Sequence, residues 1–540
     1  MNREETAPFR LIARPLRRLH PIPAGCAVGI LVLLFTLLPA PLGSGSRAVL
    51  AQTTPLYRSA VGTAGPGVVT PVASAAVAPD DHNLLLKEPF FVEPNFAGIS
   101  DTGSYPPDPI IAVGPDHIVA AVNSRWTVYT KSGTQLRTFF ADTWLADTLP
   151  ALDRSDVWAF DPQVAYDHFS NRWLMSWIAK DDDNRQAWML VSVSAGTDPE
   201  GDWCSRAFST TLDGSTSTGN WGDFDGLGFD NQAVYITTNQ FSFSSDDFAY
   251  AKIRILDKAR LYGPCTSSVP WRDFWDLRDP DFPNFTSGTV RPAITFGTPG
   301  VQYFLGRGLW DGRQYQAVTL WSLTNPLGAS PSLTSLNISV TSYTAAPDAG
   351  QLGGGVALDS GDTRFLNVVY RGSSLWAAHT VADPTGQFSQ VSYVRIDVPT
   401  RTVVEDVRLG APNCWYFYPA LAVDALSNLH LVFNRSCTTE YVGAWYAVRR
   451  AGARNLEPEV LLKAGETNYV RGVRTSAGAS RWGDYSGAAV DPSDPAKVWL
   501  FAEYASATAN RWGTWIAEGA SVLPVNYIPA DLLRPRRRPR

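Results

Sequence analysis

Short apolar runs separated by turn residues dominate the chain from Leu84 onward. The runs are rich in Val, Ile, Tyr, Trp and Phe, and Gly, Pro, Asp and Asn stand between them. Asn171–Ala179 and Ala187–Val193, for example, read as two neighbouring strands. Short runs of β-branched and aromatic residues with such boundaries predict β-strands, and long helical periodicity is missing from the sequence. The pattern predicts an all-β fold.

A degenerate opening phrase recurs along this pattern. Asp108-Pro-Ile-Ile-Ala112, Asp161-Pro-Gln-Val-Ala165 and Tyr418-Pro-Ala-Leu-Ala422 share one frame. Openings that fit the frame begin at residues 108, 161, 224, 291, 353, 418 and 485, at steps of 53 to 67 residues. Near-regular repeats of three or four strands each predict a β-propeller, with seven blades and with six or eight left open. Two β-sandwich domains are the alternative architecture.

One longer sequence motif occurs twice within this frame. Asn220–Phe241 and Arg481–Tyr504 both carry Trp-Gly-Asp, then an aromatic residue, and two positions later Gly. We interpret the two copies as one blade-opening turn that was retained in two blades. The run Leu84–Val92 is a candidate strand for closing the ring on the last blade.

The chain divides into four segments by composition. Residues 1–51 carry a basic leader, an apolar run from Ala24 to Leu38 and small residues before Gln52, a pattern typical of a signal peptide. An uncleaved anchor is the alternative. Residues 52–82, rich in Ala, Thr, Pro and Ser, predict a flexible linker. We expect the β-propeller in residues 83–520 and a basic tail in residues 521–540.

The cysteines agree with export. Removal of the signal peptide leaves Cys204, Cys265, Cys414 and Cys437. An even number of cysteines in an exported protein predicts two disulfides. Four cysteines allow three pairings, and the sequence leaves the choice open. We expect a secreted or cell-surface location.

Charge excludes one class of partner. The formal net charge is −6 over 540 residues, so the chain offers no electrostatic basis for binding nucleic acid. A membrane contact is expected only through an uncleaved N-terminal segment. The oligomeric state is not predicted.

Candidate site residues follow from the repeat frame. The first strand of each propeller blade lines the central channel, so the openings of the repeats are expected to meet at one mouth. The residues at these openings are Asp108, Asp161, Asp223, Asp225, Arg291, Tyr418, Arg481 and Asp484, with the aromatics Trp221, Phe224, Trp482 and Tyr485.

Two roles are assigned within this set. Carboxylates can act as catalytic acids or bases, and the catalytic candidates are Asp161, Asp223, Asp225 and Asp484. Aromatic rings stack on sugar faces and arginine binds carboxylates, so the ligand-binding candidates are Asp108, Arg291, Tyr418, Arg481, Trp482 and Tyr485. Asp before Pro or beside Gly also caps turns. Arg291 and Arg481, which the repeats do not share, are therefore the stronger functional candidates.

Signals for metals and cofactors are weak. No cofactor and no metal site is predicted, because the sequence lacks a phosphate loop, an HExxH motif and an EF-hand loop. Asp181–Asn184 and Asp246-Asp247 read as hairpin loops, with structural calcium as the alternative.

The second Trp-Gly-Asp phrase carries a family resemblance. Arg481-Trp-Gly-Asp-Tyr-Ser-Gly487 with Asp491-Pro resembles a phrase common in exported bacterial β-propeller proteins, a group loosely labelled sialidase-like. Asp161–Asp167 followed by Arg172-Trp173 is similar to the same group. The sequence departs from true sialidases because it has no intact S-x-D-x-G-x-x-W motif. Their arginine triad and tyrosine nucleophile are therefore not carried over.

The function expected is that of an exported binding or interaction protein for glycans or envelope polymers. The alternative is a carbohydrate-active enzyme (a glycoside hydrolase, sialidase-like, or a polysaccharide lyase) with its site at the channel mouth. An enzyme is expected to bring two carboxylates together in a polar pocket that breaks the repeat.

Overall fold

The computed structural model of the protein describes residues 58–62, 92–152, 156–473 and 478–520. The chain divides into two units, Met1–Thr53 and Thr54–Arg540, and all described residues belong to the second. The predicted signal peptide, most of the predicted linker, the basic tail and Cys26 lie outside the described residues. Among the described residues, no helix has the length and apolar character to cross a membrane.

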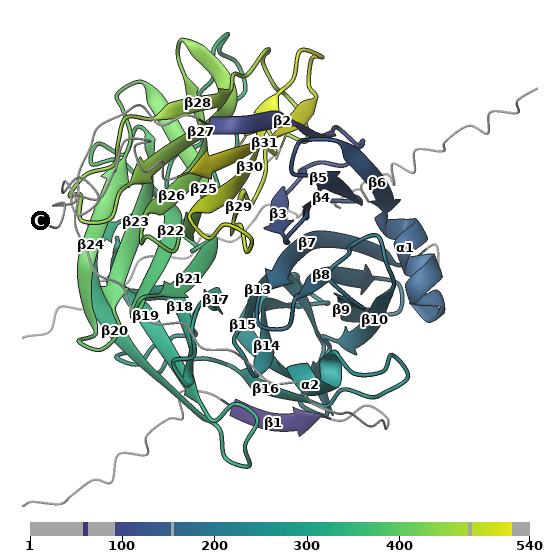
Figure 1. The fold of residues 1–540 in the computed structure, drawn as a ribbon. Coiled ribbons are helices and arrows are strands. Elements are labelled where there is room, and N and C mark those ends of the chain that lie inside the picture. Colours follow the sequence, from purple (N-terminus) through teal and green to yellow (C-terminus); the bar gives the residue numbers. More distant parts are fainter. Residues whose placement is uncertain (1–57, 63–91, 153–155, 474–477, 521–540) are drawn as a thin grey trace, which may run out of the picture. The chain divides into compact units, whose positions relative to one another are not determined.

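Consecutive strands pair antiparallel into four-stranded meanders (Figure 1). The first two meanders are β3 (Ile110–Val113), β4 (His117–Val122), β5 (Arg125–Thr130) and β6 (Gln135–Phe140), then β7 (Trp158–Asp167), β8 (Arg172–Asp181), β9 (Gln186–Ser194) and β10 (Trp203–Ser209). The next two are β13 (Asn220–Phe229), β14 (Ala233–Ser242), β15 (Phe248–Asp257) and β16 (Trp271–Trp275), then β17 (Val290–Thr295), β18 (Val301–Trp310), β19 (Tyr315–Thr324) and β20 (Ser332–Tyr343).

The C-terminal half continues the pattern. Its meanders are β21 (Asn367–Arg371), β22 (Ser374–Ala382), β23 (Ser389–Asp397) and β24 (Thr402–Leu409), then β25 (Cys414–Val423), β26 (Leu429–Cys437), β27 (Glu440–Arg449) and β28 (Val460–Lys463). The last one joins β29 (Gly487–Val490), β30 (Lys497–Ala505) and β31 (Trp512–Ala520) with β2 (Val92–Ser100) from the other end of the described chain.

The first strands of the meanders, which we call the inner strands, form a closed series of contacts. They touch in the order β3, β7, β13, β17, β21, β25 and β29, and β29 touches β3 again. Each meander therefore packs on the next, which confirms the all-β propeller and rules out two separate β-sandwiches. The blade number stays a prediction, because β13, β17 and β21 are bridged in parallel and fuse three meanders into one 13-stranded sheet.

Helices are short and lie in connections. α1 (Ala141–Thr148) and the 3-10 turn η1 (Pro150–Leu152) join β6 to β7. α2 (Lys258–Leu261) follows β15, and the Asp257 carboxylate caps it by accepting hydrogen bonds from the N–H groups of Ala259 and Arg260. A small hairpin of β11 (Leu212–Asp213) and β12 (Thr216–Ser217) precedes β13.

The two ends of the described chain differ from the sequence interpretation. The closing strand of the last meander is Val92–Ser100, later than the predicted run Leu84–Val92, of which only Val92 is described. Within the predicted linker, Arg58–Gly62 forms β1, which pairs antiparallel with the edge strand β16. Backbone pairing at a free sheet edge needs no apolar periodicity, so composition did not indicate this strand.

The fifth predicted opening is also wrong. Gly353–Asp359 lies in the connection between β20 and β21, and the inner strand there is Asn367–Arg371. Gly353, Gly354 and Gly355 all have positive φ, between 65° and 90°, which is incompatible with a regular strand.

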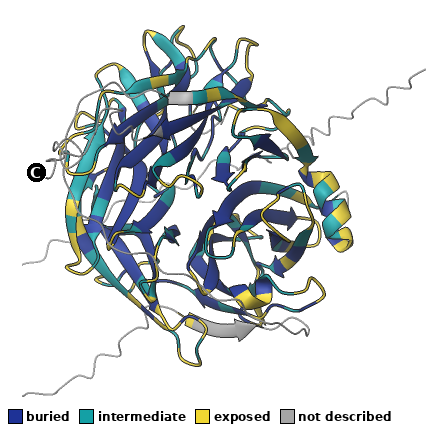
Figure 2. Ribbon diagram, viewed as in Figure 1, coloured by how far each residue is buried: buried dark blue, intermediate teal, exposed yellow. Residues whose placement is uncertain are grey.

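The apolar core lies between neighbouring meanders, and Figure 2 shows that buried residues run along their inner strands. Tryptophans fill these interfaces, and the largest fully buried ones are Trp126, Trp173, Trp321, Trp376, Trp482, Trp499 and Trp512. Each such ring removes about 150–250 Å² from water, which explains why so many tryptophans occur in the sequence.

Both predicted disulfides are present. Cys204 pairs with Cys265 and Cys414 pairs with Cys437. The first joins β10 to the segment before β16, and the second joins β25 to its neighbour β26. The expectation of two disulfides is confirmed, and the pairing that the sequence left open is resolved.

Candidate functional site

Local backbone irregularities place the predicted site residues at the beginnings of the inner strands. Asp161, Phe224 and Tyr418 have positive φ of 51°, 53° and 49°. Each lies where the pairing of its inner strand shifts register, as in a β-bulge. Bulges re-aim side chains and are common beside functional sites. Left-handed non-glycine residues cost about 1–3 kcal/mol, so surrounding contacts must hold them.

Asp108 joins three meanders. Its carboxylate accepts hydrogen bonds from Asn123 Nδ2 at 2.6 Å and from the backbone N–H of Asp484 at 2.7 Å. The Asn123 side chain in turn accepts one from the backbone N–H of Asp161 at 2.8 Å. Burial, together with the neighbouring Asp484 charge, raises the pKa of Asp108 to about 7.

Three more aspartates belong to this region, and their charges interact through Asp161. Burial raises the pKa of Asp161, and the negative charges of Asp223, Asp108, Asp484 and Asp225 raise it further. Burial also raises the pKa of Asp223, and it raises that of Asp225 to about 7. Ser176 Oγ donates to Asp225 Oδ2 at 2.6 Å, while the buried Asp225 Oδ1 has no hydrogen-bond partner among the described residues. The aspartates predicted from separate repeats therefore lie in one electrostatic environment.

Arg291 is the buried cation of this region. Its guanidinium lies 4.3 Å from the centre of the Phe224 ring and 5.2 Å from that of Tyr485. It donates to the backbone carbonyls of Asp225 and Phe365. Its Nη2 group is buried and has no hydrogen-bond partner in the described part of the chain.

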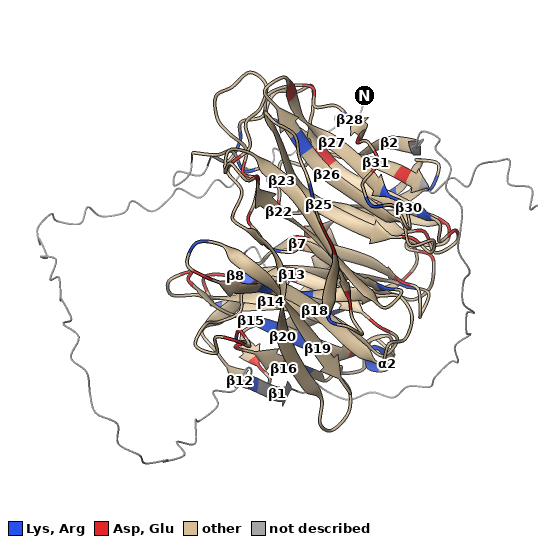
Figure 3. Cartoon of the chain, turned by 90° about the vertical axis from the view of Figure 1, so that its left-hand side faces the viewer, with Lys and Arg blue, Asp and Glu red and all other residues tan. Residues whose placement is uncertain are grey.

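A layer of partly exposed charges accompanies the buried groups. Arg481 forms a two-pronged ion pair with Asp484 and lies 3.6 Å from Asp359. Arg364 pairs with Asp362 at 2.7 Å, and its guanidinium lies 4.0 Å from the centre of the Phe224 ring. The side chains of Arg364 and Asp362 are 27% and 37% exposed. Figure 3 shows acidic and basic positions on strands as well as in loops.

Sequence reasoning missed four members of this group, and one of them, Asp359, is the last residue of the misassigned fifth opening. Arg364 and Asp362 follow the misassigned fifth opening and were not singled out. Glu503 lies on β30, is fully buried, and neither of its carboxylate oxygens has a hydrogen-bond partner among described residues. Burial and the Asp108 charge raise the pKa of Glu503. A single glutamate inside the apolar run Val498–Tyr504 was the available signal.

The two Trp-Gly-Asp phrases have different structures. Asn220–Asp223 is part of β13, whereas Arg481–Asp484 lies in the connection before β29, so the interpretation as one retained turn is wrong. The aromatic residues three positions after each tryptophan meet instead. The rings of Phe224 and Tyr485 stack with centres 5.0 Å apart, and Tyr485 Oη donates to Asp161 at 3.4 Å.

The remaining aromatic candidates are enclosed by protein. Trp482 is fully buried and its indole N–H donates to Asn434 Oδ1 at 3.2 Å. Trp221 is partly buried, and Lys180 Nζ lies 3.5 Å from the centre of its ring. The Tyr418 hydroxyl is buried and lacks a hydrogen-bond partner within the described residues. We call the group of charged and aromatic residues around Asp108 and Arg291 the inner cluster. Its members are Asp108, Asp161, Asp223, Phe224, Asp225, Arg291, Asp359, Asp362, Arg364, Tyr418, Arg481, Asp484, Tyr485 and Glu503.

Two groups of described residues bring three potential metal ligands within 4.8 Å of one another. Cys414, Cys437 and Glu440 form one, but both thiols are consumed by the disulfide. His117, Asp198 and Glu200 form the other, outside the inner cluster. In the predicted calcium loop, the Asp181 carboxylate accepts from the backbone and side chain of Asn184 at 2.9 and 2.8 Å, as in a capped turn. Structural calcium stays a prediction.

Comparison with known proteins gives likeness in fold only. No protein-family model matches the chain, and no curated protein matches it. It resembles the phage phi92 endosialidase (9% identity, TM-score 0.41), covering 80% of this chain and 70% of that one. It also resembles an unknown function protein from Dyadobacter fermentans (8%, 0.39), covering 68% and 96%.

The Trypanosoma rangeli sialidase in complex with the inhibitor DANA is a third similar structure, at 9% identity and a TM-score of 0.36. The match covers 71% of this chain but only 56% of the sialidase. At these identities and TM-scores the likeness supports no argument about activity or substrate. That the Trp-Gly-Asp phrase marks a sialidase-like group stays a prediction.

Proposed function

We propose that this chain is an exported binding protein that holds part of a glycan at the inner cluster. The observation that carries the proposal is the incomplete hydrogen bonding of buried polar groups there. Asp225 Oδ1, Arg291 Nη2, the Tyr418 hydroxyl and both oxygens of Glu503 lack partners among the described residues. Buried polar groups are usually satisfied, and exceptions mark strained or functional positions.

The chemistry of the cluster suits a ligand rich in hydroxyl groups. Carboxyl groups whose pKa is raised toward neutrality, such as Asp108, can donate as well as accept hydrogen bonds. Guanidinium groups add donors, and the Phe224 and Tyr485 rings supply apolar surface. A sugar presents both hydroxyl groups and C–H faces, so it matches this combination.

The partly exposed pairs are the groups that such a ligand reaches first. Arg364 and Asp362 are the more exposed pair, and Arg481 and Asp484 are 15% and 19% exposed. Export is part of the proposal. It rests on the N-terminal pattern of the sequence and agrees with the two disulfides, which persist in oxidising compartments.

One observation favours a second function, that of a carbohydrate-active enzyme. A general acid works best when its pKa lies near the working pH, and burial raises the pKa of both Asp108 and Asp225 to about 7. Either carboxyl group could then protonate a leaving oxygen. Asp161, Asp223 and Asp484 remain the other catalytic candidates.

A glycan array combined with a polysaccharide degradation screen tests the proposal on the full chain. Binding without release of shortened products supports the binding protein. Release of reducing ends, abolished by Asp108→Asn or Asp225→Asn, supports the enzyme instead. Neither binding nor release across the panel contradicts both functions.

A further inference from the structure

A cavity of about 380 Å³ lies at the edge of the first two meanders, between β6, α1 and the segment that leads into β10. Its volume falls within the range of about 300–1,000 Å³ that is usual for ligand sites. No member of the inner cluster lines it. We call it the edge cavity, and it has no place in the function proposed above.

Aromatic rings form its fixed wall. Phe139 stacks on Trp126 with ring centres 3.9 Å apart, and Trp144 meets Phe139 and Trp203 edge-on at 5.4 and 5.7 Å. The Trp203 indole N–H donates to the Pro199 carbonyl at 2.9 Å. Because packing and this hydrogen bond already hold the rings in place, these side chains would lose little conformational entropy when a ligand binds.

One further ring stands at the rim. Phe140 is 52% exposed, and the Arg125 guanidinium lies 4.8 Å from the centre of its ring. Phe140 belongs to the lining, so it adds an exposed apolar ring to the cavity.

The polar part of the lining is acidic. Asp147, Glu200 and Asp202 belong to the lining, and none of the three is in an ion pair within the described residues. The Glu200 carboxylate also lies within 4.8 Å of ligand atoms of His117 and Asp198. Arg137 is the cation of the lining, and its guanidinium lies over the Phe139 ring at 4.5 Å. Three carboxylates against one guanidinium disfavour an anionic ligand and leave acceptors for hydroxyl or ammonium donors.

We infer that the edge cavity is a second binding site, for a saccharide that carries no acidic group. The ring wall takes the C–H face of a sugar, and the unpaired carboxylates accept hydrogen bonds from its hydroxyl or amino groups. An apolar ligand leaves these carboxylates desolvated without partners, which costs affinity. A carboxylated or sulfated saccharide meets repulsion from them.

Isothermal titration calorimetry on the full chain tests this inference. The probes are cellobiose, N,N′-diacetylchitobiose and its de-acetylated diamine, with 3′-sialyllactose as the anionic comparison. The variants are Phe140→Ala and the double variant Asp147→Asn/Asp202→Asn. All three substituted residues are exposed, so we expect both variants to fold. Phe248→Ala, which removes a 40% exposed ring from β15, is the matched control.

We expect at least one uncharged or amino-bearing probe to bind. The double variant should weaken it about tenfold or more, since each lost charged hydrogen bond corresponds to roughly that factor. Phe140→Ala should weaken it severalfold, and Phe248→Ala should leave it unchanged. The inference is overturned if no uncharged or amino-bearing probe binds, if the variants bind like the wild type, or if sialyllactose is the preferred probe. Because these variants lie outside the inner cluster, failure here leaves the proposed function untouched.

Discussion

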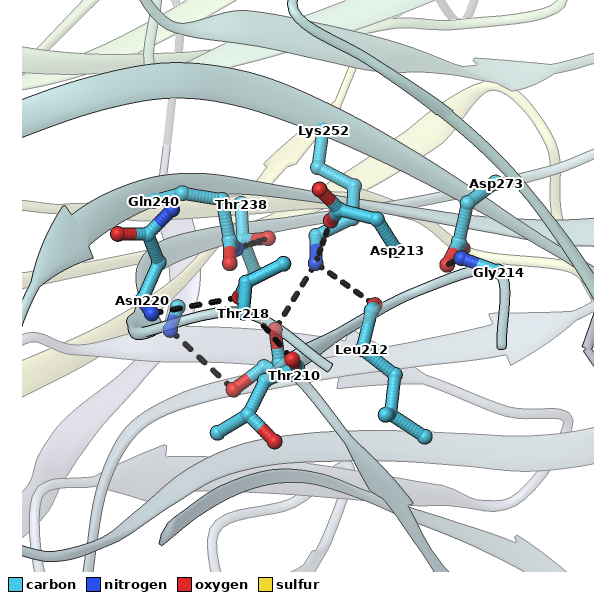
Figure 4. A network of polar contacts seen from close by, with 12 residues as sticks. Thr210, Leu212, Asp213, Gly214, Thr218, Asn220, Thr238, Gln240, Lys252 and Asp273 are labelled. Atoms are coloured by element: carbon cyan, nitrogen blue, oxygen red, sulfur yellow. Dashed lines mark hydrogen bonds and ion pairs between the residues drawn. The ribbon is translucent and has the colours of Figure 1, made fainter. Parts of the chain in front are cut away.

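Two buried polar regions of this protein contrast in how well their hydrogen bonds are satisfied. One is the inner cluster. The other, which we call the Lys252 network, lies in the meander β13–β16 and its preceding hairpin. It consists of Asp213, Tyr250, Lys252, Arg254 and Asp273, of which Figure 4 labels Asp213, Lys252 and Asp273.

Every charged atom of the Lys252 network has partners. Lys252 Nζ donates to Asp213 and to the carbonyls of Thr210 and Leu212 at 2.8, 2.9 and 3.0 Å. The Arg254 guanidinium donates two hydrogen bonds to the Asp273 carboxylate, at 2.8 and 2.7 Å. The network alternates positive and negative charges, as expected of a region whose task is to hold the fold.

The inner cluster instead gathers like charges and leaves polar atoms unpaired. Such an arrangement costs free energy that the fold must supply elsewhere. The contrast teaches that burial of charge alone does not distinguish a site from a scaffold in this molecule. Between these two regions, the completeness of hydrogen bonding is the difference.

The largest expected effect comes from breaking the satisfied region. Arg254→Met leaves the buried Asp273 without its ionic partner, and we expect the free energy of unfolding to fall by about 3–5 kcal/mol. Chemical denaturation measures it. Arg395→Met is the control, because its pair with Glu405 is partly exposed and should be worth about 1 kcal/mol or less. Equal losses in the two variants would contradict a structural role for the network.

Removing the disulfide between Cys204 and Cys265 should have the second largest effect. Cys204→Ser/Cys265→Ser opens a link across 61 residues, and we expect a loss of about 2–4 kcal/mol. Thermal unfolding with and without reductant measures it. Glycan binding at the inner cluster should persist in this variant while it remains folded; its loss would mean that the two regions are coupled.

The pH dependence of stability tests the inner cluster, the second region of the comparison. Below about pH 4 the Asp225 carboxyl is protonated in both the folded and the unfolded chain. Between pH 4 and 7 the unfolded chain has lost this proton but the folded chain keeps it, because the folded pKa is about 7. Stability therefore falls as the pH rises through this window and levels off above it.

Asp225→Asn removes that contribution. We expect the variant to match the wild type near pH 4 and to exceed its stability near pH 8, by up to about 3 kcal/mol. Denaturation midpoints across this range measure the difference. A variant curve parallel to that of the wild type would contradict the raised pKa, because it would show that Asp225 titrates alike in the folded and the unfolded chain.

The smallest effect is expected for Glu503→Gln. Burial already favours the uncharged form of Glu503, so a neutral amide of the same shape should change the free energy of unfolding by less than about 1 kcal/mol. Denaturant unfolding at pH 7 checks this. A loss as large as that of Arg254→Met would show that Glu503 acts as a charged structural residue.

The sequence predicted much of this site because the inner strands begin with recognisable residues. Proline after Asp108, Asp161 and Tyr418 and the repeated spacing were enough to expect that these openings converge. Asp225, Arg291 and Arg481 lie with them, as expected from the same frame.

Other features of the structure could not be predicted from the sequence. The segment Gly353–Asp359 fits the sequence frame of a blade opening, but the positive φ values of its glycines show that it is a loop. Arg364, which follows this segment, was therefore not predicted. The edge cavity joins β6 and α1 to residues near Trp203, more than fifty positions away. Periodicity describes which face of a strand is buried, but not which distant edges come together.

The central claim is that the inner cluster is a ligand site, and a glycan array on paired variants tests it most directly. Arg364→Gln and Arg395→Gln remove arginines of similar exposure, 27% and 32%, each paired with a carboxylate and each lying over an aromatic ring. The array is best run in the Asp147→Asn/Asp202→Asn background, so that the edge cavity does not contribute. We predict that Arg395→Gln keeps the glycan signals and that Arg364→Gln lowers them about tenfold or more. Undiminished binding by Arg364→Gln, with the same glycans as before, would contradict the claim.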